Sequence, residues 1–291
     1  MQDCFTSVPG VRIGHAHDAA ARTGVTLIVP DAPVVMAVDV RGGGPGTRET
    51  DALDPAALVD RVHGLALAGG SVFGLAAADA LVLCLSEAGI GIDIGEGLPR
   101  VPVVPGAILF DLSNGGDKNW GSDPPYRRLA RAAFAALGSG DVSEPVGAGH
   151  GARAGSRAGG IGSAATSLKS GHRIGALVAV NSFGEVYAGE PPMGAVPMPK
   201  LERKTPGTQN TCIGAIATDA PLTRAQARRV AMMAHDGLAR AIRPIHTPFD
   251  GDTIFVLSTA AGGETDNVAL AEIGTLAADM VALAVRRGVG V

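Results

Sequence analysis

The junction between residues 210 and 211 carries the residue types that amide hydrolysis needs. A polar segment, PGTQN at 206–210, runs directly into TCIGAIATDA at 211–220, a buried-strand pattern whose first residue is threonine. A threonine hydroxyl attacks an amide only when a base stands beside it, because its own pKa is too high. If the chain is cut before Thr211, the new α-amine, with an ordinary pKa of about 7.7–8.0, supplies that base on the same residue.

The same hydroxyl can make the cut. Its attack on the Asn210 carbonyl moves the acyl group from nitrogen to oxygen, and water then hydrolyses the ester. We therefore predict self-cleavage between Asn210 and Thr211, with Thr211 as the catalytic nucleophile. The alternative is a loop entering a strand that happens to begin with threonine, and the Asn-Thr dipeptide alone does not separate the two.

Three more polar residues stand at the ends of apolar runs. Asn181 ends GALVAVN at 175–181, so its amide is expected at a strand tip, where an active site can collect groups. Asp250 and Asp252 flank Gly251 just before the apolar run TIFVLST, and their spacing aims both carboxylates in one direction in extended chain. The structural alternatives are a turn-capping asparagine and a simple Asp-Gly turn.

Glycine-rich segments are candidates for a pocket wall. Gly70 and Ser71, in LAGGSVFG, are predicted to bind substrate through their backbone N–H groups, and residues 42–46 (GGGPG) are a second candidate. Neither segment fits a phosphate-binding loop, and close packing of backbones is the alternative role. Cys212 is expected to point to the opposite face of its strand from Thr211. Each of the seven histidines is expected at the surface or in a turn rather than as a base.

Composition excludes several classes of function. The 291-residue chain has 42 glycines and only 3% aromatic residues, which favours a compact layered α/β fold. A net charge of −4 without a basic stripe argues against nucleic-acid binding. Three cysteines without metal-ligand spacing predict neither a disulfide framework nor a metal site. The N-terminus lacks signal-peptide features, and no apolar run reaches about 18 residues, so we expect a cytoplasmic protein that binds no membrane.

Periodicity predicts alternating strands and helices in a single domain. Strands are expected at 23–29, 33–40 and 173–181 and again near IGIDI and PVVPGAILFDL, with a helix-to-strand transition at 55–67. Helices are expected at 75–88, 126–137, 223–243 and 267–287, and Thr223 with Gln226 forms a capping box. The proline-rich stretch 188–210 is predicted as a loop and is the one candidate linker.

Long motifs in a fixed order resemble the DmpA-type aminopeptidase family, which includes β-peptidyl aminopeptidases and nylon-oligomer hydrolases. They run almost end to end: VPGVRIGHAHDAAARTGVTLIVP (8–30), RGGGPGTRETDALDP (41–55), LAGGSVFGLAAADA (67–80), VPGAILFDL (104–112), GGIGSAA (159–165), GALVAVNSFGEV (175–186), NTCIGAIATDAPLT (210–223) and PFDGDTIFVLST (248–259).

The resemblance implies a four-layer αββα sandwich of the DmpA and ornithine acetyltransferase-like type, in the α/β (α+β) class. It implies an N-terminal-nucleophile hydrolase in which Thr211 matches the nucleophile and Asn181 the oxyanion donor. The position of Asp250 and Asp252 matches groups that orient the nucleophile's hydroxyl and amine. Relatives assemble as homotetramers of α/β pairs, and neither a metal nor an organic cofactor is needed.

Two polar groups of the family are missing from this chain. Some relatives have a lysine where Ala158 stands, and the nylon hydrolases and β-aminopeptidases have a tyrosine where Phe110 stands. Lys118 and backbone N–H groups are candidates to replace them.

The prediction is a self-processing amidase or aminopeptidase of one domain, residues 1–291, cut into an α chain (1–210) and a β chain (211–291). Its expected substrate is a small amide or peptide: an α-peptide, a β-peptide, a pantetheine-like amide or a nylon oligomer. The alternatives are an acyltransferase of the ornithine acetyltransferase type, with an amine as acceptor, and a non-catalytic family member.

Overall fold

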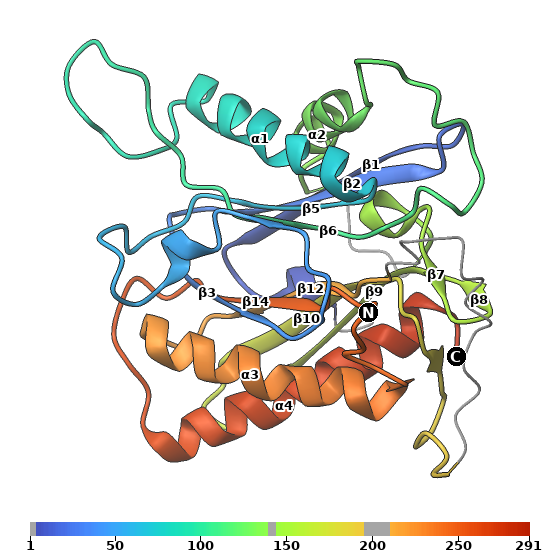
Figure 1. Cartoon of the computed structure of the whole chain (residues 1–291). Coiled ribbons are helices and arrows are strands. Elements are labelled where there is room, and N and C mark those ends of the chain that lie inside the picture. Colours follow the sequence, from blue (N-terminus) through green and yellow to red (C-terminus); the bar gives the residue numbers. More distant parts are fainter. Residues whose placement is uncertain (1–3, 139–143, 195–209) are drawn as a thin grey trace.

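Two five-stranded sheets lie face to face at the centre of the structure, a computed structural model that describes residues 4–138, 144–194 and 210–291 (Figure 1). The first sheet has the order β1-β2-β5-β6-β4, formed by β1 (Val11–Asp18), β2 (Thr23–Pro30), β5 (Leu65–Ala68), β6 (Gly106–Ile108) and β4 (Thr47–Arg48). The second has the order β3-β14-β12-β10-β9, formed by β3 (Val35–Val40), β14 (Thr253–Ser258), β12 (Ile213–Thr218), β10 (Arg173–Val180) and β9 (Gly160–Ser167).

Two pairs of helices cover the outer faces of the sheets (Figure 1). Helices α1 (Ala76–Glu87) and α2 (Tyr126–Ala135) pack on the first sheet, and α3 (Arg224–Ala241) and α4 (Asn267–Gly288) pack on the second. The smaller elements are β7 (Arg153–Ala154), β8 (Arg157–Ala158), β11 (Glu185–Val186) and β13 (Ile242–Arg243), with 3-10 turns at Phe5–Ser7, Asp51–Leu53, Ser71–Leu75 and Gly147–Gly149.

Three hydrophobic cores separate the four layers. Because successive side chains of a strand point to opposite faces, each central strand contributes to two of them. In β2, Ile28 faces the other sheet and Leu27 faces α1 and α2. In β12, Ile213 faces the other sheet and Ile216 faces α3 and α4. The predicted αββα sandwich is therefore confirmed.

The long helices begin where their sequences predict. The side chain of Thr223 accepts the Gln226 N–H at 3.2 Å, and the Gln226 side chain accepts the Thr223 N–H at 3.1 Å, which completes the capping box of α3. The Asp266 side chain caps α4. Helix α4 is long and apolar enough, by length and composition, to cross a membrane, which a count of consecutive apolar residues overlooked. Its apolar residues pack into the core between α3 and the second sheet.

Several predicted elements need correction. Residues 55–64 contain no helix, and IGIDI makes a single bridge, Ile92 to Val101, rather than a strand. Strands β1 and β9 were not predicted, because β1 mixes polar with apolar residues on both faces and β9 consists mainly of glycine, alanine and serine. Most of the predicted proline-rich loop, 195–209, lies outside the described residues.

Candidate active site

The four predicted catalytic side chains meet where three neighbouring strands end or begin. Asn181 follows the last residue of β10, Thr211 precedes β12, and Asp250 and Asp252 precede β14. Strand β12 pairs antiparallel with β10 and parallel with β14, so the end of β10 lies beside the beginnings of β12 and β14. All four residues are buried, Thr211 with 2% of its surface exposed and both aspartates with none.

The peptide bond between Asn210 and Thr211 is held at both of its polar atoms. The Thr211 N–H donates to the carbonyl oxygen of Asn181 at 2.6 Å, and the Asn210 carbonyl oxygen accepts the Gly251 N–H at 3.0 Å. The Asn210 N–H donates to Phe249 O at 3.0 Å. Hydrogen bonds at a carbonyl oxygen and at the adjacent N–H fix the plane of an amide, and the donor to the oxygen also stabilises charge that develops there. We call this arrangement the 210–211 clamp.

Gly251 brings the backbone of this loop against the threonine side chain. A Cβ atom at this position would stand 2.8 Å from Thr211 Oγ1 and 2.6 Å from the carbonyl oxygen of Gly44. On the other side, the Gly44 N–H donates to Asp250 O at 2.7 Å, and Gly42 packs directly on the Asp250 backbone. The glycines at 42–46 therefore serve the close approach of one backbone to another.

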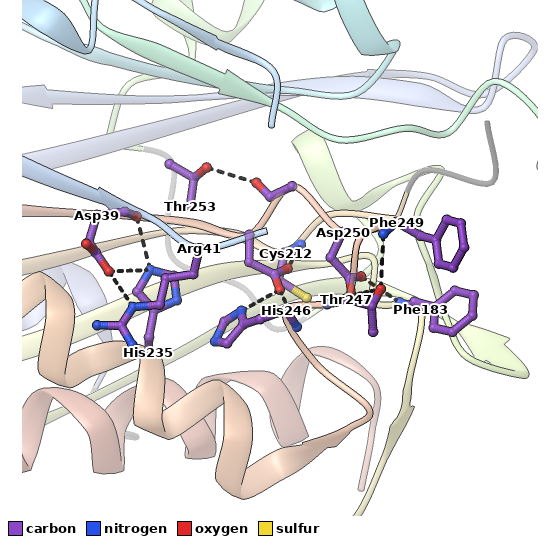
Figure 2. A network of polar contacts seen from close by, with 12 residues as sticks. Asp39, Arg41, Phe183, Cys212, His235, His246, Thr247, Phe249, Asp250 and Thr253 are labelled. Atoms are coloured by element: carbon purple, nitrogen blue, oxygen red, sulfur yellow. Dashed lines mark hydrogen bonds and ion pairs between the residues drawn. The ribbon is translucent and has the colours of Figure 1, made fainter. Parts of the chain in front are cut away.

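Asp250 is held by its own loop and by the turn after β10 (Figure 2). Its Oδ2 accepts the Thr247 N–H at 2.9 Å and the Thr247 hydroxyl at 2.7 Å, and its Oδ1 accepts the Phe183 N–H at 3.2 Å. Burial, and secondly the negative charge of Asp252, raise the pKa of Asp250 to about 6. This carboxyl group is therefore able to exchange a proton near neutral pH.

Asp252 is bonded to the residue after the threonine. Its Oδ1 accepts the Cys212 N–H at 2.9 Å, and its Oδ2 accepts the N–H of His246 at 3.2 Å and contacts His246 Nδ1 at 2.8 Å. Within the described residues, neither carboxylate bonds the Thr211 hydroxyl directly. The Asp252 carboxylate is instead bonded to the backbone of Cys212, the residue after the threonine, and the backbone of Asp250 forms a parallel bridge with Asn210, the residue before it.

Asn181 has a fixed amide orientation. Its Oδ1 accepts the Arg153 N–H at 2.8 Å, and its Nδ2 donates to the Phe110 carbonyl oxygen at 3.1 Å. Since an amide nitrogen carries two hydrogens, one remains to donate to a developing oxyanion. At position 110, where the family resemblance implies a tyrosine, this chain contributes a backbone carbonyl that positions Asn181.

Gly70 and Ser71 are connected to the same segment. The Gly70 N–H donates to Asp111 Oδ1 at 2.8 Å, and the Ser71 N–H donates to Leu109 O at 3.0 Å. Their φ angles are +83° and +53°, and the second is unusual for a residue that is not glycine. The turn is thus anchored on both sides of Phe110, and both N–H groups have protein partners.

The position of the missing lysine, Ala158, and the candidate to replace it, Lys118, both lie away from the Thr211 hydroxyl. Ala158 is exposed at the end of β8. Lys118 donates from Nζ to the carbonyl oxygens of Ala21 and Arg22, and burial lowers the pKa of its ammonium group. Its hydrogen bonds therefore bind it to the start of β2 rather than to the threonine hydroxyl.

Two groups escaped the sequence prediction. The Gly251 N–H was missed because a backbone donor has no side-chain signature, although a glycine between two aspartates could have drawn attention to it. The prediction that histidines lie at the surface or in turns is wrong for His63 and His235, which are buried, and it overlooked the contact of His246 with Asp252.

Cys212 packs in the core beneath α3 and α4, where burial raises its thiol pKa well above the usual value. The described residues contain no group of three or more metal-ligating side chains.

An αββα sandwich with a buried threonine, an asparagine and two carboxyl groups at adjoining strand ends has the groups that an amide hydrolase requires. The sequence model of peptidase family S58 matches residues 3–290, and the chain belongs to this family. The resemblance to the DmpA-type aminopeptidases is thereby confirmed, and with it the broad class of a hydrolase that acts on peptide or amide bonds.

Similar proteins agree with this assignment. An "uncharacterized aminopeptidase" of Mycobacterium tuberculosis is 41% identical over 98% of this chain and 93% of its own. A "6-aminohexanoate-oligomer endohydrolase" of a Kocuria species is 30% identical over 86% of this chain and 73% of its own. The L-aminopeptidase D-Ala-esterase/amidase of Ochrobactrum anthropi, described as a variant of the Ntn hydrolase fold, superimposes with a TM-score of 0.77, covering 98% of this chain and 85% of its own. At 23% identity, this last likeness concerns the fold alone.

Proposed function

We propose that this chain cuts itself between Asn210 and Thr211 and then hydrolyses small amide or peptide substrates with Thr211 as an N-terminal nucleophile. The observation that supports the proposal most is the 210–211 clamp. The bond to be cut has its carbonyl oxygen on the Gly251 N–H and its nitrogen on the Asn181 carbonyl, and the hydroxyl lies against Gly251. The backbone bonds continue the pairing of β12 with β10 and β14, and the close approach of the buried hydroxyl to Gly251 is the contact that a loop merely entering a strand would not require.

In self-cleavage, Thr211 Oγ1 attacks the Asn210 carbonyl carbon, and negative charge develops on the oxygen that faces the Gly251 N–H. The C–N bond breaks when the nitrogen takes a proton, which leaves an ester on Oγ1 and a free α-amine. Water then hydrolyses the ester, so that Asn210 ends in a carboxylate and Thr211 begins a new chain. The Asn181 carbonyl, which accepts the Thr211 N–H beforehand, is placed to accept from the new amine.

In catalysis, the free α-amine takes the hydroxyl proton as Oγ1 attacks the substrate carbonyl. The remaining N–H of Asn181 Nδ2 stabilises the oxyanion. The amine passes the proton to the leaving nitrogen, an acyl ester of Thr211 remains, and water hydrolyses it by the same steps. Asp252 fixes the backbone after the threonine through the Cys212 N–H, and a carboxylate close to the new amine favours its ammonium form.

The identity of the substrate follows less directly. The named activities of the relatives, aminopeptidase and 6-aminohexanoate-oligomer endohydrolase, both cleave an amide bond of a short chain of amino-acid units. We propose this class, with Gly70 and Ser71 at the wall of the substrate pocket. The further proposals are a cytoplasmic enzyme, without metal, that assembles as a homotetramer of α/β pairs.

Substitution of the nucleophile tests the proposal. Thr211→Ala should give a folded, uncut and inactive protein, and Thr211→Ser should retain cleavage and some activity, because a serine hydroxyl can perform both reactions. Activity is measured with aminoacyl anilides, β-peptides and 6-aminohexanoate oligomers. Thr218→Ala is the matched control, since Thr218 is a buried threonine at the far end of β12, the strand that follows Thr211, and its hydroxyl bonds Arg173 O at 2.8 Å.

Full activity and cleavage in Thr211→Ala would place the nucleophile elsewhere. Addition of hydroxylamine or ornithine separates hydrolysis from acyl transfer. A product that carries the added amine at the expense of the free acid would favour the acyltransferase alternative.

A further inference from the structure

His246 contacts one of the two site carboxylates with both its ring and its backbone. The residue lies in the loop between β13 and Asp250, and its φ of +56° is a conformation that few residues other than glycine and asparagine adopt. In this conformation the His246 N–H and Nδ1 lie 3.2 Å and 2.8 Å from the same oxygen, Oδ2 of Asp252. The other oxygen accepts the Cys212 N–H. Asp252 thus joins His246 directly to the backbone beside Thr211.

The hydrogen bonds determine which atoms carry protons. A carboxylate accepts, so the contact between His246 Nδ1 and Asp252 Oδ2 requires the proton on Nδ1. The ring of His246 is 21% exposed, whereas the carboxylate behind it is fully buried. His246 therefore lies between solvent at the edge of the site and the buried carboxylate of Asp252.

A second histidine supports the first (Figure 2). The His235 ring meets the His246 ring edge to face, with centroids 4.9 Å apart. His235 Nε2 donates to the Asp39 carbonyl oxygen at 3.0 Å, and the Asp39 carboxylate pairs with Arg41. Burial lowers the pKa of His235 to about 4, so this ring is neutral at neutral pH, and its edge-to-face contact sets the orientation of the His246 ring.

We propose that His246 is a positioning residue of the reaction: by donating from Nδ1 it holds the Asp252 carboxylate in place on the Cys212 N–H, and so fixes the position of the Thr211 hydroxyl and amine. This inference rests on the proposed role of Thr211. The arrangement contains the three groups of a catalytic triad, a nucleophile, a histidine and a carboxylate. In a triad the histidine lies next to the nucleophile, whereas here the carboxylate lies between the nucleophile and the histidine. The α-amine remains the base, and His246 exchanges no proton with the substrate.

Two variants separate the donor from the backbone conformation. His246→Gly removes the ring and tolerates φ of +56°, and His246→Asn tolerates the same φ and returns a side-chain N–H near the position of Nδ1. The matched pair His172→Gly and His172→Asn serves as control, because His172 forms an exposed histidine–aspartate contact of 3.5 Å with Asp219 outside the site. Cleavage is checked first by denaturing electrophoresis, and kcat, KM and Tm are measured on cleaved protein.

We expect His246→Gly to lower kcat by about 10–100-fold, the range found when an outer partner of a functional group is removed. KM should change less than threefold, because His246 does not contact the substrate. His246→Asn should recover most of the lost kcat. Added imidazole should raise the kcat of His246→Gly but not that of the wild type or the other variants. If His246→Gly is not cleaved, the rate at which the two fragments appear is measured instead of kcat, and the asparagine variant and added imidazole are expected to restore that rate. The His172 variants should behave as wild type.

A wild-type kcat in cleaved His246→Gly would overturn the proposal. A loss that neither asparagine nor imidazole recovers, accompanied by a lower Tm, would also overturn it, since a purely structural role predicts that result. Thr211→Ala is assayed in parallel. If that variant is inactive, these outcomes concern His246 alone; if it is fully active, the proposed function fails and the role of His246 fails with it.

Discussion

At the scale of residues, the site contains two carboxylates with different surroundings. Asp252 faces N–H donors from Cys212 and His246, whereas Asp250 is bonded to Thr247 and Phe183 and lies in the field of its neighbour. Burial, and after it the charge of Asp252, raise the pKa of Asp250. We therefore assign the ability to hold a proton near pH 6 to Asp250.

This assignment predicts how stability depends on pH. The pKa of Asp250 is about 6 in the folded protein, against an ordinary value of 3.8. A raised carboxyl pKa contributes stability that is fully present below pH 3.8 and is lost as pH rises to about 6, because the unfolded state releases its proton first. Asp250→Asn removes this pH-dependent loss of stability, because asparagine does not ionise. The Tm of the variant should therefore rise relative to wild type between pH 4 and pH 6, as measured by calorimetry in matched buffers. A constant difference in Tm over that range would contradict the assignment.

At the scale of elements, the site depends on strand ends and on the loops that join them. The end of β10 and the beginnings of β12 and β14 adjoin because the three strands are neighbours in one sheet. The loop 41–46 covers the aspartates by backbone contact, which requires glycine at its closest points. Substitutions that push these backbones apart should impair the chemistry before they affect the core.

Gly251→Ala tests this dependence. A methyl group there would stand 2.6 Å from Gly44 O and 2.8 Å from Thr211 Oγ1, both closer than ordinary contact. We expect slow or absent self-cleavage, because the Gly251 N–H moves away from the Asn210 carbonyl, and a modest loss of Tm. Gly262→Ala is a suitable control, since a Cβ there would meet only Arg61 at 3.9 Å. Cleavage of Gly251→Ala at the wild-type rate would show that the clamp is not needed.

Much of this arrangement could be predicted from local signals. The capping box of α3 involves residues three apart, and the strand around 213–218 is a continuous apolar run, so both are readable in the sequence. The small side chains of β9 gave no such signal, because its burial arises from α4 packing above it. The contact between His246 and Asp252 depends on a loop conformation with positive φ, which residue types alone do not specify. Thr211, Asn181 and the aspartates could be predicted together because long ordered motifs resembled a family.

At the scale of the whole molecule, the proposed cut separates the chain without separating the layers. Residues 211–291 contribute β12, β14, α3 and α4, and in the second sheet β14 and β12 lie between β3 and β10 of the preceding part. The second sheet is therefore built from both fragments, which are joined by full ladders of hydrogen bonds and a shared core. The two fragments are expected to remain one folded unit after cleavage.

The mass of the purified protein under native and denaturing conditions tests the central claim most directly. The account predicts two fragments in denaturant, residues 1–210 and 211–291, of about 21 and about 8 kDa from the 29.1 kDa chain, which stay together in native buffer. N-terminal sequencing of the smaller fragment should read Thr-Cys-Ile-Gly. A single uncut chain of 29.1 kDa with full amidase activity would contradict the account, because Thr211 would then have no α-amine to act as its base.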